Sequence, residues 1–336
     1  MTQMNPPFCS FIIPLYKTTN ELFSRCLESI GKQTDGDYEV IVVERENELT
    51  SSRPFVDNER LRRIVISNPG VSAARNIGLG DARGAYVVFV DADDWIPDGL
   101  VKELRKKVLE WNGPDIVVFG SDDVERREEG GRLLYLKDVR YTIFNPFINT
   151  VPGFNQKSVY AKAFRREGLA GVRFDVSLSM AEDQFFLFAA LDSASTLGVD
   201  LNFLGYHYAI SETSNTFTIE NNRPEVYQNL IEAWKGYLKK SARPLSEYRN
   251  FWSSLTAVYI PMMLAHYFCS PANLASKSDR YLSFKKLLRE PDYSKAVKKS
   301  RFANCLTFKK VIQLFYLKTR FLSPMFSYYE KRKVRG

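Results

Sequence analysis

Histidine and cysteine are scarce in this sequence of 336 residues, which contains two of the first and four of the second. Two histidines are too few for a histidine-rich metal site, and they argue against a Ser-His-Asp catalytic triad. The cysteines lie far apart along the chain, at Cys9, Cys26, Cys269 and Cys305. Because no two are close in sequence, neither a disulfide framework nor a zinc site is expected, and a reducing compartment suits the protein best.

The sequence also lacks apolar segments that direct a protein into or across a membrane. Residues 1–7 show no basic stretch followed by an apolar run, so no secretory signal is expected. No stretch reaches the roughly 18 apolar residues of a spanning helix. Hydrophobic residues make up 45% of the chain and charged residues 26%, which is ordinary for a globular protein. We therefore expect a cytoplasmic globular protein of about two domains.

Strands and helices alternate over the first 120 residues. Apolar runs predict strands, and apolar positions three and four residues apart predict helices. The expected strands are 8–15, 38–43, 63–67, 85–90 and 115–119, and the expected helices are 20–30, with Asn20 as its N-cap, 73–79 and 100–111. This alternation is typical of a parallel sheet in an α/β domain, and the continuous apolar run 85–90 indicates a strand covered on both faces.

The pattern changes after about residue 125. Residues 125–131 read as a charged turn or hairpin tip, and 140–180 mix proline, glycine and aromatic residues without a clear period. A helix is expected at 182–191, and the chain is mainly helical from about residue 224 to its end. The sequence therefore predicts a second, helical region after the α/β domain.

Three aspartates follow the buried strand 85–90 directly, in the sequence Asp91-Ala92-Asp93-Asp94. Ligands of open α/β sheets bind beyond the carboxyl ends of the strands, so the position favours a site. Divalent cations such as Mg²⁺ take carboxylate oxygens and share their coordination shell with phosphates. Three carboxylates within four residues repel one another unless a cation or a specific structure compensates. We therefore expect a metal ion and a diphosphate here; the alternative is that the aspartates only cap the helix that begins near residues 97–100.

Four stretches of the sequence resemble, in the same order, motifs of family 2 glycosyltransferases of the GT-A fold. Residues 10–17 (SFIIPLYK) resemble the first strand and nucleotide loop of that family. Residues 68–78 (NPGVSAARNIG) resemble its helix before the metal strand, and 88–95 (VFVDADDW) its DXD motif. The pair Glu182-Asp183, followed by two phenylalanines, resembles its acidic motif on the acceptor side. Each motif alone is weak, but their joint order and spacing over about residues 8–215 is specific.

The resemblance implies an architecture and a reaction. The fold would be α/β, a GT-A, Rossmann-like mixed sheet with flanking helices. The catalytic domain would cover 1–220, with a nucleotide-sugar half at about 8–125 and an acceptor half at about 126–220, followed by a helical basic region at 221–336. The reaction would move a sugar, with inversion, from a nucleotide-diphosphate donor, UDP-sugar by preference, to a hydroxyl of a glycan or lipid-linked acceptor in surface polysaccharide synthesis.

On the donor side, the resemblance implies that Pro14, Leu15 and Tyr16 line the base and ribose pocket. It also implies that Arg75 approaches the base or the diphosphate; the alternative is a surface helix arginine. The family usually has Asp-Asp-Gly-Ser after its second strand, and an aspartate there contacts the base. Here Glu44 stands in place of the first aspartate and the Gly-Ser turn is missing, so the diphosphate is predicted more firmly than the nucleoside.

At the reacting end, the resemblance implies that Asp91 lies near the ribose and the metal, and that Asp93 is the main ligand of a Mn or Mg ion. Asp183 would be the catalytic base, because inverting transfer needs a carboxylate that takes the proton of the acceptor hydroxyl. Glu182 and Trp95 would lie on the acceptor side, where Trp95 would stack on a sugar. The alternative for the two acidic residues is that they are first-turn charges of a helix, which the helix dipole favours.

Three other polar residues have simpler explanations. Asn76 is expected to order the backbone instead of contacting a ligand. His207 lies among aromatic residues, and we expect it to be packed or acceptor-side and not a metal ligand. His266 is expected to pack within a helix.

Two other functional classes share some of these motifs. Phosphatases of the haloacid dehalogenase type also have Asp-x-Asp after an apolar strand, with a Thr or Val four residues after the first aspartate and near the chain start. Here Trp95 occupies that position, some ninety residues into the chain. A degenerate, non-catalytic sugar-binding glycosyltransferase is the second alternative; the altered loop at Glu44 supports it, whereas Asp93 and Asp183 argue against it.

Positive charge is concentrated at the C-terminal end of the chain. Residues 271–336 contain 17 Lys and Arg against 4 Asp and Glu, a net charge of +13, whereas the whole chain carries +8. Between 305 and 329, apolar residues at partly helical spacing are mixed with basic ones. A basic amphipathic helix is typical of binding to an anionic membrane surface, so 305–336 predicts contact with the inner face of the membrane and not with nucleic acid. A helix packed on the catalytic domain with a solvated basic face is an equally good explanation.

Overall fold

The computed structural model describes residues 6–46, 59–67, 70–123, 130–137, 155, 158–209, 218–240, 251–302 and 307–332. The chain forms two compact units. The first consists of Met1–Tyr141, Val151–Val176 and Ala181–Ile210, and the second of Thr142–Thr150, Ser177–Met180 and Ser211–Gly336. Most of the charged turn expected at 125–131 lies outside the described residues.

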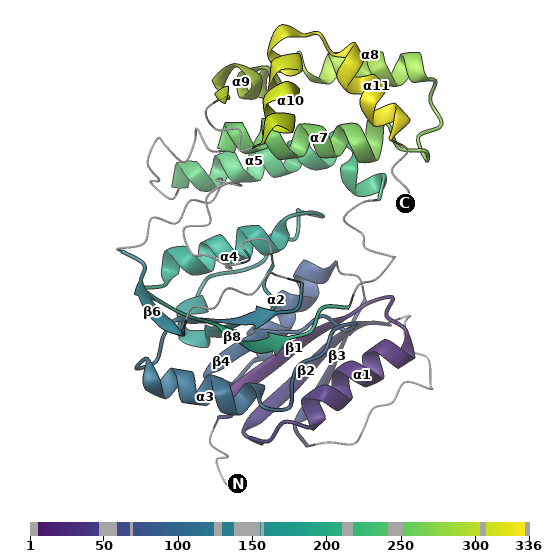
Figure 1. The fold of residues 1–336 in the computed structure, drawn as a ribbon. Helices are drawn as coiled ribbons and strands as arrows, with labels where there is room; N and C mark the ends of the chain where they lie inside the picture. Colours follow the sequence, from purple (N-terminus) through teal and green to yellow (C-terminus); the bar gives the residue numbers. More distant parts are fainter. Residues whose placement is uncertain are drawn as a thin grey trace. The chain divides into compact units, whose positions relative to one another are not determined.

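The first unit is built on one eight-stranded mixed sheet (Figure 1). The strands are β1 (Cys9–Leu15), β2 (Tyr38–Arg45), β3 (Leu61–Ile66), β4 (Tyr86–Phe89), β5 (Ile116–Ser121), β6 (Arg132–Tyr135), β7 (Lys162–Arg165) and β8 (Thr196–Tyr206). Their order is β3-β2-β1-β4-β7-β5-β8-β6. The pairs among β3, β2, β1 and β4 are parallel, as is β5 with β8, while β7 is antiparallel to both its neighbours and β6 to β8. The predicted mixed α/β fold is confirmed. The alternation of strands and helices, which favoured a parallel sheet, did not reveal β6, β7 or β8, and β6 and β7 are the antiparallel members of the sheet.

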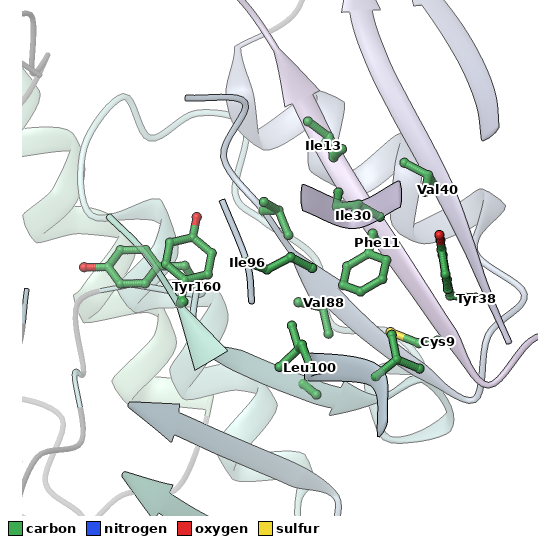
Figure 2. Packing of buried hydrophobic residues seen from close by; sticks show 14 of the residues in the cluster. Cys9, Phe11, Ile13, Ile30, Tyr38, Val40, Val88, Ile96, Leu100 and Tyr160 are labelled. Carbon is green, nitrogen blue, oxygen red and sulfur yellow. The ribbon is translucent and has the colours of Figure 1, made fainter. Parts of the chain in front are cut away.

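Helices cover both faces of this sheet (Figure 1). The helices are α1 (Asn20–Gly31), α2 (Val71–Asp81), α3 (Leu100–Glu110) and α4 (Glu182–Ser193), with a short 3₁₀ helix η2 (Arg166–Leu169) after β7. Side chains alternate between the two faces along a strand. Phe11 and Ile13 of β1 therefore lie on the same face and pack in a hydrophobic core with residues of α1 and α3, part of which is shown in Figure 2. Ile12, between them, faces α2 and lies against Gly78. The N-cap expected at Asn20 was wrong by one residue, since Thr19 accepts the hydrogen bond from the Leu22 N–H at 3.4 Å.

Gly84, in the turn between α2 and β4, lies directly against the backbone of β1. A Cβ atom on Gly84 would lie 2.6 Å from the Ser10 nitrogen and 2.7 Å from the Cys9 carbonyl carbon. Backbone atoms inside a sheet have little room to shift, so we predict that Gly84→Ala lowers the free energy of unfolding by about 2–3 kcal/mol in urea titration. Gly80→Ala is the matched control, because that glycine is helical and has no atom within 4 Å. It should leave stability unchanged or raise it by up to about 1 kcal/mol; equal effects of the two variants would contradict the prediction.

The secondary-structure elements described in the second unit are all helical, as predicted for the C-terminal region. Its elements are η4 (Glu220–Asn222), α5 (Pro224–Lys240), the π-helical turns η5 (Leu255–Tyr259) and η6 (Leu264–Phe268), α7 (Ile260–Met263), α8 (Lys277–Leu287), α9 (Pro291–Lys299), α10 (Phe308–Thr319) and α11 (Ser323–Lys331). An ion pair between Arg280 and Glu330 joins α8 to α11, and the same arginine donates to the Phe268 carbonyl at 2.6 Å. Among the described residues, no helix combines the length and apolar character needed to cross a membrane.

Candidate active site

The acidic residues after β4 lie at the same edge of the sheet as the end of β1. The two strands are parallel neighbours, and the Val90 N–H donates to the Ile12 carbonyl at 3.0 Å, just before the aspartates begin. The carboxyl ends of adjacent parallel strands therefore bring Tyr16 and Asp91 to one edge, which is where ligands of open α/β sheets bind. This edge is the candidate site.

One buried arginine joins three carboxylates at this edge. Arg75, on α2, is 3% exposed. Its two terminal nitrogens donate to Asp91 Oδ1 at 2.8 Å and to Asp183 Oδ1 at 2.5 Å, and Glu182 Oε1 lies 3.7 Å away. Arg75 also packs over the ring of Phe174, with 5.3 Å from its guanidinium carbon to the ring centroid. Three segments that are remote in sequence thus meet at one guanidinium, which we call the Arg75 junction.

The charges at the Arg75 junction shift one another's pKa. Burial raises the pKa of Asp183 to about 7; Arg75 and the backbone N–H of Val159 lower it, while Glu182 and Asp91 raise it. Burial also disfavours the arginine cation, yet the three carboxylates together raise the pKa of Arg75 above its ordinary value. The guanidinium is therefore a permanent charge, and Asp183 is the member that changes protonation near neutral pH.

Asp94 differs from the other two aspartates of the cluster because it points into the protein. It is 1% exposed, and its carboxylate accepts hydrogen bonds from the Tyr206 hydroxyl at 2.5 Å and the Ala209 N–H at 2.7 Å. The Tyr206 oxygen in turn accepts from the Asp91 N–H at 3.1 Å. Asp94 and Tyr206 therefore fix the acidic loop to the end of β8, a structural role that the sequence analysis did not assign.

Asp93 is the carboxylate of the cluster that is left for a ligand. It is half-buried, and among the described residues no other residue donates a hydrogen bond to its side chain. Its own carbonyl accepts from Arg25 at 2.8 Å. Burial and the nearby Asp91 raise the pKa of Asp93. A cation at this carboxylate would relieve both effects, because opposite charge favours the ionised form.

The donor set fits a divalent cation that is shared with a phosphate, and does not fit an all-protein cage. Within the described part of the chain, no group of three or more His, Cys, Asp or Glu side chains is arranged to hold a metal ion. One oxygen of Asp91 is already bound by Arg75. Mg²⁺ is typically held by one or two carboxylates together with substrate phosphates and water, which is what Asp91 and Asp93 can offer.

The residues expected at the nucleotide base divide into buried and exposed ones. Pro14 and Leu15 are buried within β1, whereas Tyr16 is 43% exposed. Glu44 is fully buried and forms an ion pair with Arg63 of β3. Tyr16 is therefore exposed at the edge of the sheet that forms the candidate site, whereas Glu44 is buried.

Trp95, expected to stack on a sugar, already has protein partners. Its backbone exchanges two hydrogen bonds with His207, of 3.2 and 2.9 Å, and the two rings are stacked at 5.1 Å between centroids. The Arg25 guanidinium lies 4.0 Å from the Trp95 ring centroid. His207 Nδ1 lies 3.0 Å from Asp122 Oδ2. The packing of His207 among aromatic residues matches the expectation for it, and Trp95 forms part of the same packed cluster.

Comparison with known proteins shows what part of this chain is similar to. The model of glycosyl transferase family 2 matches residues 10–169. Among curated proteins, glycosyltransferase GlyA of Streptococcus pneumoniae is 32% identical over 188 residues, or 52% of this chain and 26% of GlyA. The succinoglycan biosynthesis protein ExoO of Rhizobium meliloti is 28% identical over 261 residues, or 71% of this chain and 72% of ExoO. This chain thus spans about a quarter of GlyA and almost three-quarters of ExoO.

A solved structure shares the fold over nearly the whole chain. Residues 1–349 of S. aureus TarS in complex with UDP-GlcNAc match with a TM-score of 0.61 and 18% sequence identity, covering 96% of this chain and 90% of that one. The predicted GT-A fold is thereby confirmed, as is the resemblance found in the sequence. Residues 10–169, which hold both Arg75 and the acidic cluster after β4, match the model of glycosyl transferase family 2.

Proposed function

We propose that this chain is a metal-dependent glycosyltransferase that moves a sugar from a nucleoside-diphosphate donor to a hydroxyl group, with inversion. The observation that supports this most strongly is the Arg75 junction, where one guanidinium binds Asp91 and Asp183. Asp91 lies at the strand edge expected for the donor, and Asp183 begins the helix expected on the acceptor side. In-line displacement needs both sides held close together, and a shared rigid cation meets that need.

In this mechanism Asp183 acts as the general base. Its carboxylate takes the proton of the acceptor hydroxyl while that oxygen bonds to the anomeric carbon. The bond from this carbon to the diphosphate oxygen breaks on the opposite face, so the configuration inverts. A general base works best when its pKa is near the operating pH, and burial raises the pKa of Asp183 to about 7.

On the donor side, Asp91 and Asp93 would hold a Mn or Mg ion, which offsets the charge of the leaving diphosphate. We propose that Tyr16 stacks on the nucleotide base, beside the backbone of Pro14 and Leu15. Because both terminal nitrogens of Arg75 already bind carboxylates, we assign it to positioning and not to the diphosphate. The donor would be a UDP-sugar, as in the TarS complex with UDP-GlcNAc.

The remaining predicted residues take supporting places in the proposal. Buried Glu44 would hold the nucleotide loop from inside the sheet through Arg63, without touching the base. Glu182 and Trp95 would border the acceptor. The name of ExoO, a succinoglycan biosynthesis protein, supports a glycan acceptor in surface polysaccharide synthesis.

Transfer or hydrolysis of a panel of UDP-sugars in the presence of Mn²⁺ tests the proposal. We predict that EDTA abolishes the activity, and that Asp93→Asn raises the Mn²⁺ concentration for half-maximal rate by about 10–100-fold. Asp35→Asn is the matched control, because that carboxylate is held by Arg105 at 2.7 Å on the surface of the same unit. Full activity in EDTA would contradict the metal, and release of phosphate from simple phosphoesters without sugar transfer would contradict the reaction.

We further propose that the second unit docks on the inner face of an anionic membrane, where a lipid-linked acceptor would be found. Phe308, Ile312 and Phe315 of α10 are 79%, 37% and 50% exposed, and their spacing puts them on one helix face. Of the basic residues on this helix, Lys310 and Lys318 donate to backbone carbonyls within the unit. We therefore expect the exposed apolar face of α10, more than its basic residues, to contact the membrane.

Sedimentation with vesicles of equal parts phosphatidylglycerol and phosphatidylcholine tests membrane docking. We predict that the double change Phe308→Ser and Phe315→Ser weakens binding at least tenfold, since each buried phenylalanine contributes roughly 1.5–3 kcal/mol. Leu274→Ser, at a 96% exposed leucine outside the helices of this unit, should leave binding unchanged. Wild-type protein that stays in the supernatant would contradict the proposal.

A further inference from the structure

Lys162 is a fully buried lysine next to the candidate active site. It begins β7, the strand that lies between β4 and β5, and it is 1% exposed. Burying an ammonium group is costly unless hydrogen bonds and opposite charges compensate for the lost water. A methionine would fill a similar volume without the cost of burying a charge. The groups that contact this ammonium therefore indicate what the charge does.

The ammonium group of Lys162 donates hydrogen bonds to backbone carbonyls just before β7. Its Nζ donates to the Ser158 carbonyl at 3.0 Å and to the Tyr160 carbonyl at 3.2 Å. Between them and β7 lies Ala161, whose φ of +53° is a left-handed conformation that is uncommon for a residue with a Cβ. Lys162 therefore holds a tight turn, residues 158–161, in a conformation that the turn would not favour alone.

The same turn donates a hydrogen bond to the proposed base. The backbone N–H of Val159 binds the Asp183 carboxylate. This N–H and the Ser158 carbonyl are the two ends of one planar peptide group. One peptide group thus lies between the Lys162 ammonium and the Asp183 carboxylate, with its oxygen toward the cation and its N–H toward the anion. Hydrogen bonds in such a chain polarise and strengthen one another.

Other charged groups act on both members of this pair. Asp183 and Asp123 favour the charged form of Lys162, against burial, which lowers its pKa to about 7. Arg75 faces Asp183 from α2, while Glu182 and Asp91 add negative charge to it. Asp183 therefore has a cation in direct contact and a second cation that reaches it through a peptide group.

We propose that Lys162 is a positioning residue for the transfer reaction, which acts on Asp183 through the Ser158–Val159 peptide and keeps its carboxylate ionised and aimed at the acceptor hydroxyl. The inference rests on the proposed function, in which Asp183 is the base. The proposed role in the reaction explains why this position holds a charged residue, since packing within the sheet does not require one.

The test compares steady-state transfer by Lys162→Met, Lys162→Arg and a control. Lys162→Met should lower kcat about 10–100-fold with the donor KM within about twofold, because a misplaced or protonated base affects the chemical step. The acid limb of its pH–rate profile should move to higher pH. Lys162→Arg keeps the charge and donors, so its acid limb should stay at the wild-type pH even if its rate is lower. Lys107→Met is the control, since that buried lysine of the same unit pairs with Asp200 at 3.0 Å and with Glu110 at 3.2 Å.

Each outcome decides the inference. If Lys162→Met keeps the wild-type acid limb, or if Lys107→Met changes kcat and the acid limb equally, Lys162 has only a structural role. If Lys162→Met does not fold, the decision rests on Lys162→Arg. The inference is overturned if the acid limb of Lys162→Arg moves to higher pH although the charge at this position is kept. Full transfer activity of Asp183→Asn would instead overturn the proposed base itself, which separates the two failures.

Discussion

Replacing Asp183 with asparagine is expected to lower kcat by about 10²–10⁴-fold, the usual contribution of a general base. Asparagine keeps the shape and can still accept a hydrogen bond from Arg75 and from the Val159 N–H, but it takes no proton at neutral pH. Because the proposed mechanism puts this side chain on the acceptor and not on the donor, the donor KM should stay within a few-fold of wild type. Initial rates with saturating donor and a glycan acceptor measure the effect.

The pH dependence of the wild-type enzyme checks the same assignment. Burial raises the pKa of Asp183 to about 7, so the base is protonated below that pH. The rate should therefore fall as pH drops through about 7, by roughly tenfold for each further unit. The measurement is made with Mn²⁺ kept saturating at every pH, so that loss of metal does not imitate loss of the base.

Glu182→Gln is the matched control for Asp183→Asn. Glu182 is the neighbouring residue on α4, of nearly the same exposure, and it lies 3.7 Å from Arg75, compared with 2.5 Å for Asp183. Removing its charge should lower the pKa of Asp183, since Glu182 raises it, and should shift the acid limb to lower pH. If Glu182→Gln loses as much activity as Asp183→Asn, the roles of the two carboxylates have been misassigned.

Local pattern was sufficient to predict most strands and helices of the first 120 residues. β4 is covered on both faces, so its sequence is a continuous apolar run that marks a strand and the strand end where the aspartates begin. Asn76 was expected to order the backbone, and it does so, accepting from the Phe174 N–H at 2.8 Å and donating to the Phe174 carbonyl at 2.9 Å. These features are readable because each depends on the period or chemistry of a few neighbouring residues.

Features that depend on distant partners were not readable. β7 has only four residues, with a charged residue at each end, so its sequence resembles a loop although Lys162 is buried. The three aspartates after β4 look alike in sequence, yet Asp94 is turned inward by Tyr206, which lies 112 positions later. No local signal distinguishes Asp94 from Asp93.

The Arg75 junction shows the same limit in the candidate site. The resemblance implied that Arg75 approaches the base or the diphosphate of the donor. Its contact with Asp183 spans 108 positions and arises only when α4 packs on the same face of the sheet as α2. Sequence motifs therefore selected the residues of the candidate site, whereas the contact between Arg75 and Asp183 depends on how the helices pack.

Replacing Arg75 with methionine is expected to lower the free energy of unfolding by about 3–5 kcal/mol at pH 8, the usual cost of removing one partner of a buried ion pair. The guanidinium side chain is 4% exposed, and its loss leaves Asp91, Glu182 and Asp183 facing one another without a cation. Arg75→Lys keeps the positive charge but loses the planar guanidinium that binds two carboxylates at once. It should therefore lose less stability than Arg75→Met. Arg165→Met removes an arginine that is 44% exposed and 3.3 Å from Glu167, and should cost roughly 0–1 kcal/mol.

The loss in free energy of unfolding caused by Arg75→Met should be smaller at low pH than at high pH. Arg75 lowers the pKa of Asp183, so without it that pKa rises above its present value of about 7. A carboxyl whose pKa is raised in the folded state binds more protons folded than unfolded, so stability is lost as pH rises from about 4 through the raised pKa. Urea titrations at pH 5 and pH 8 should therefore show a smaller deficit at pH 5, where protonation relieves the repulsion. A deficit that is equal at both pH values would mean that lost packing on Phe174, and not the unbalanced carboxylates, sets the cost.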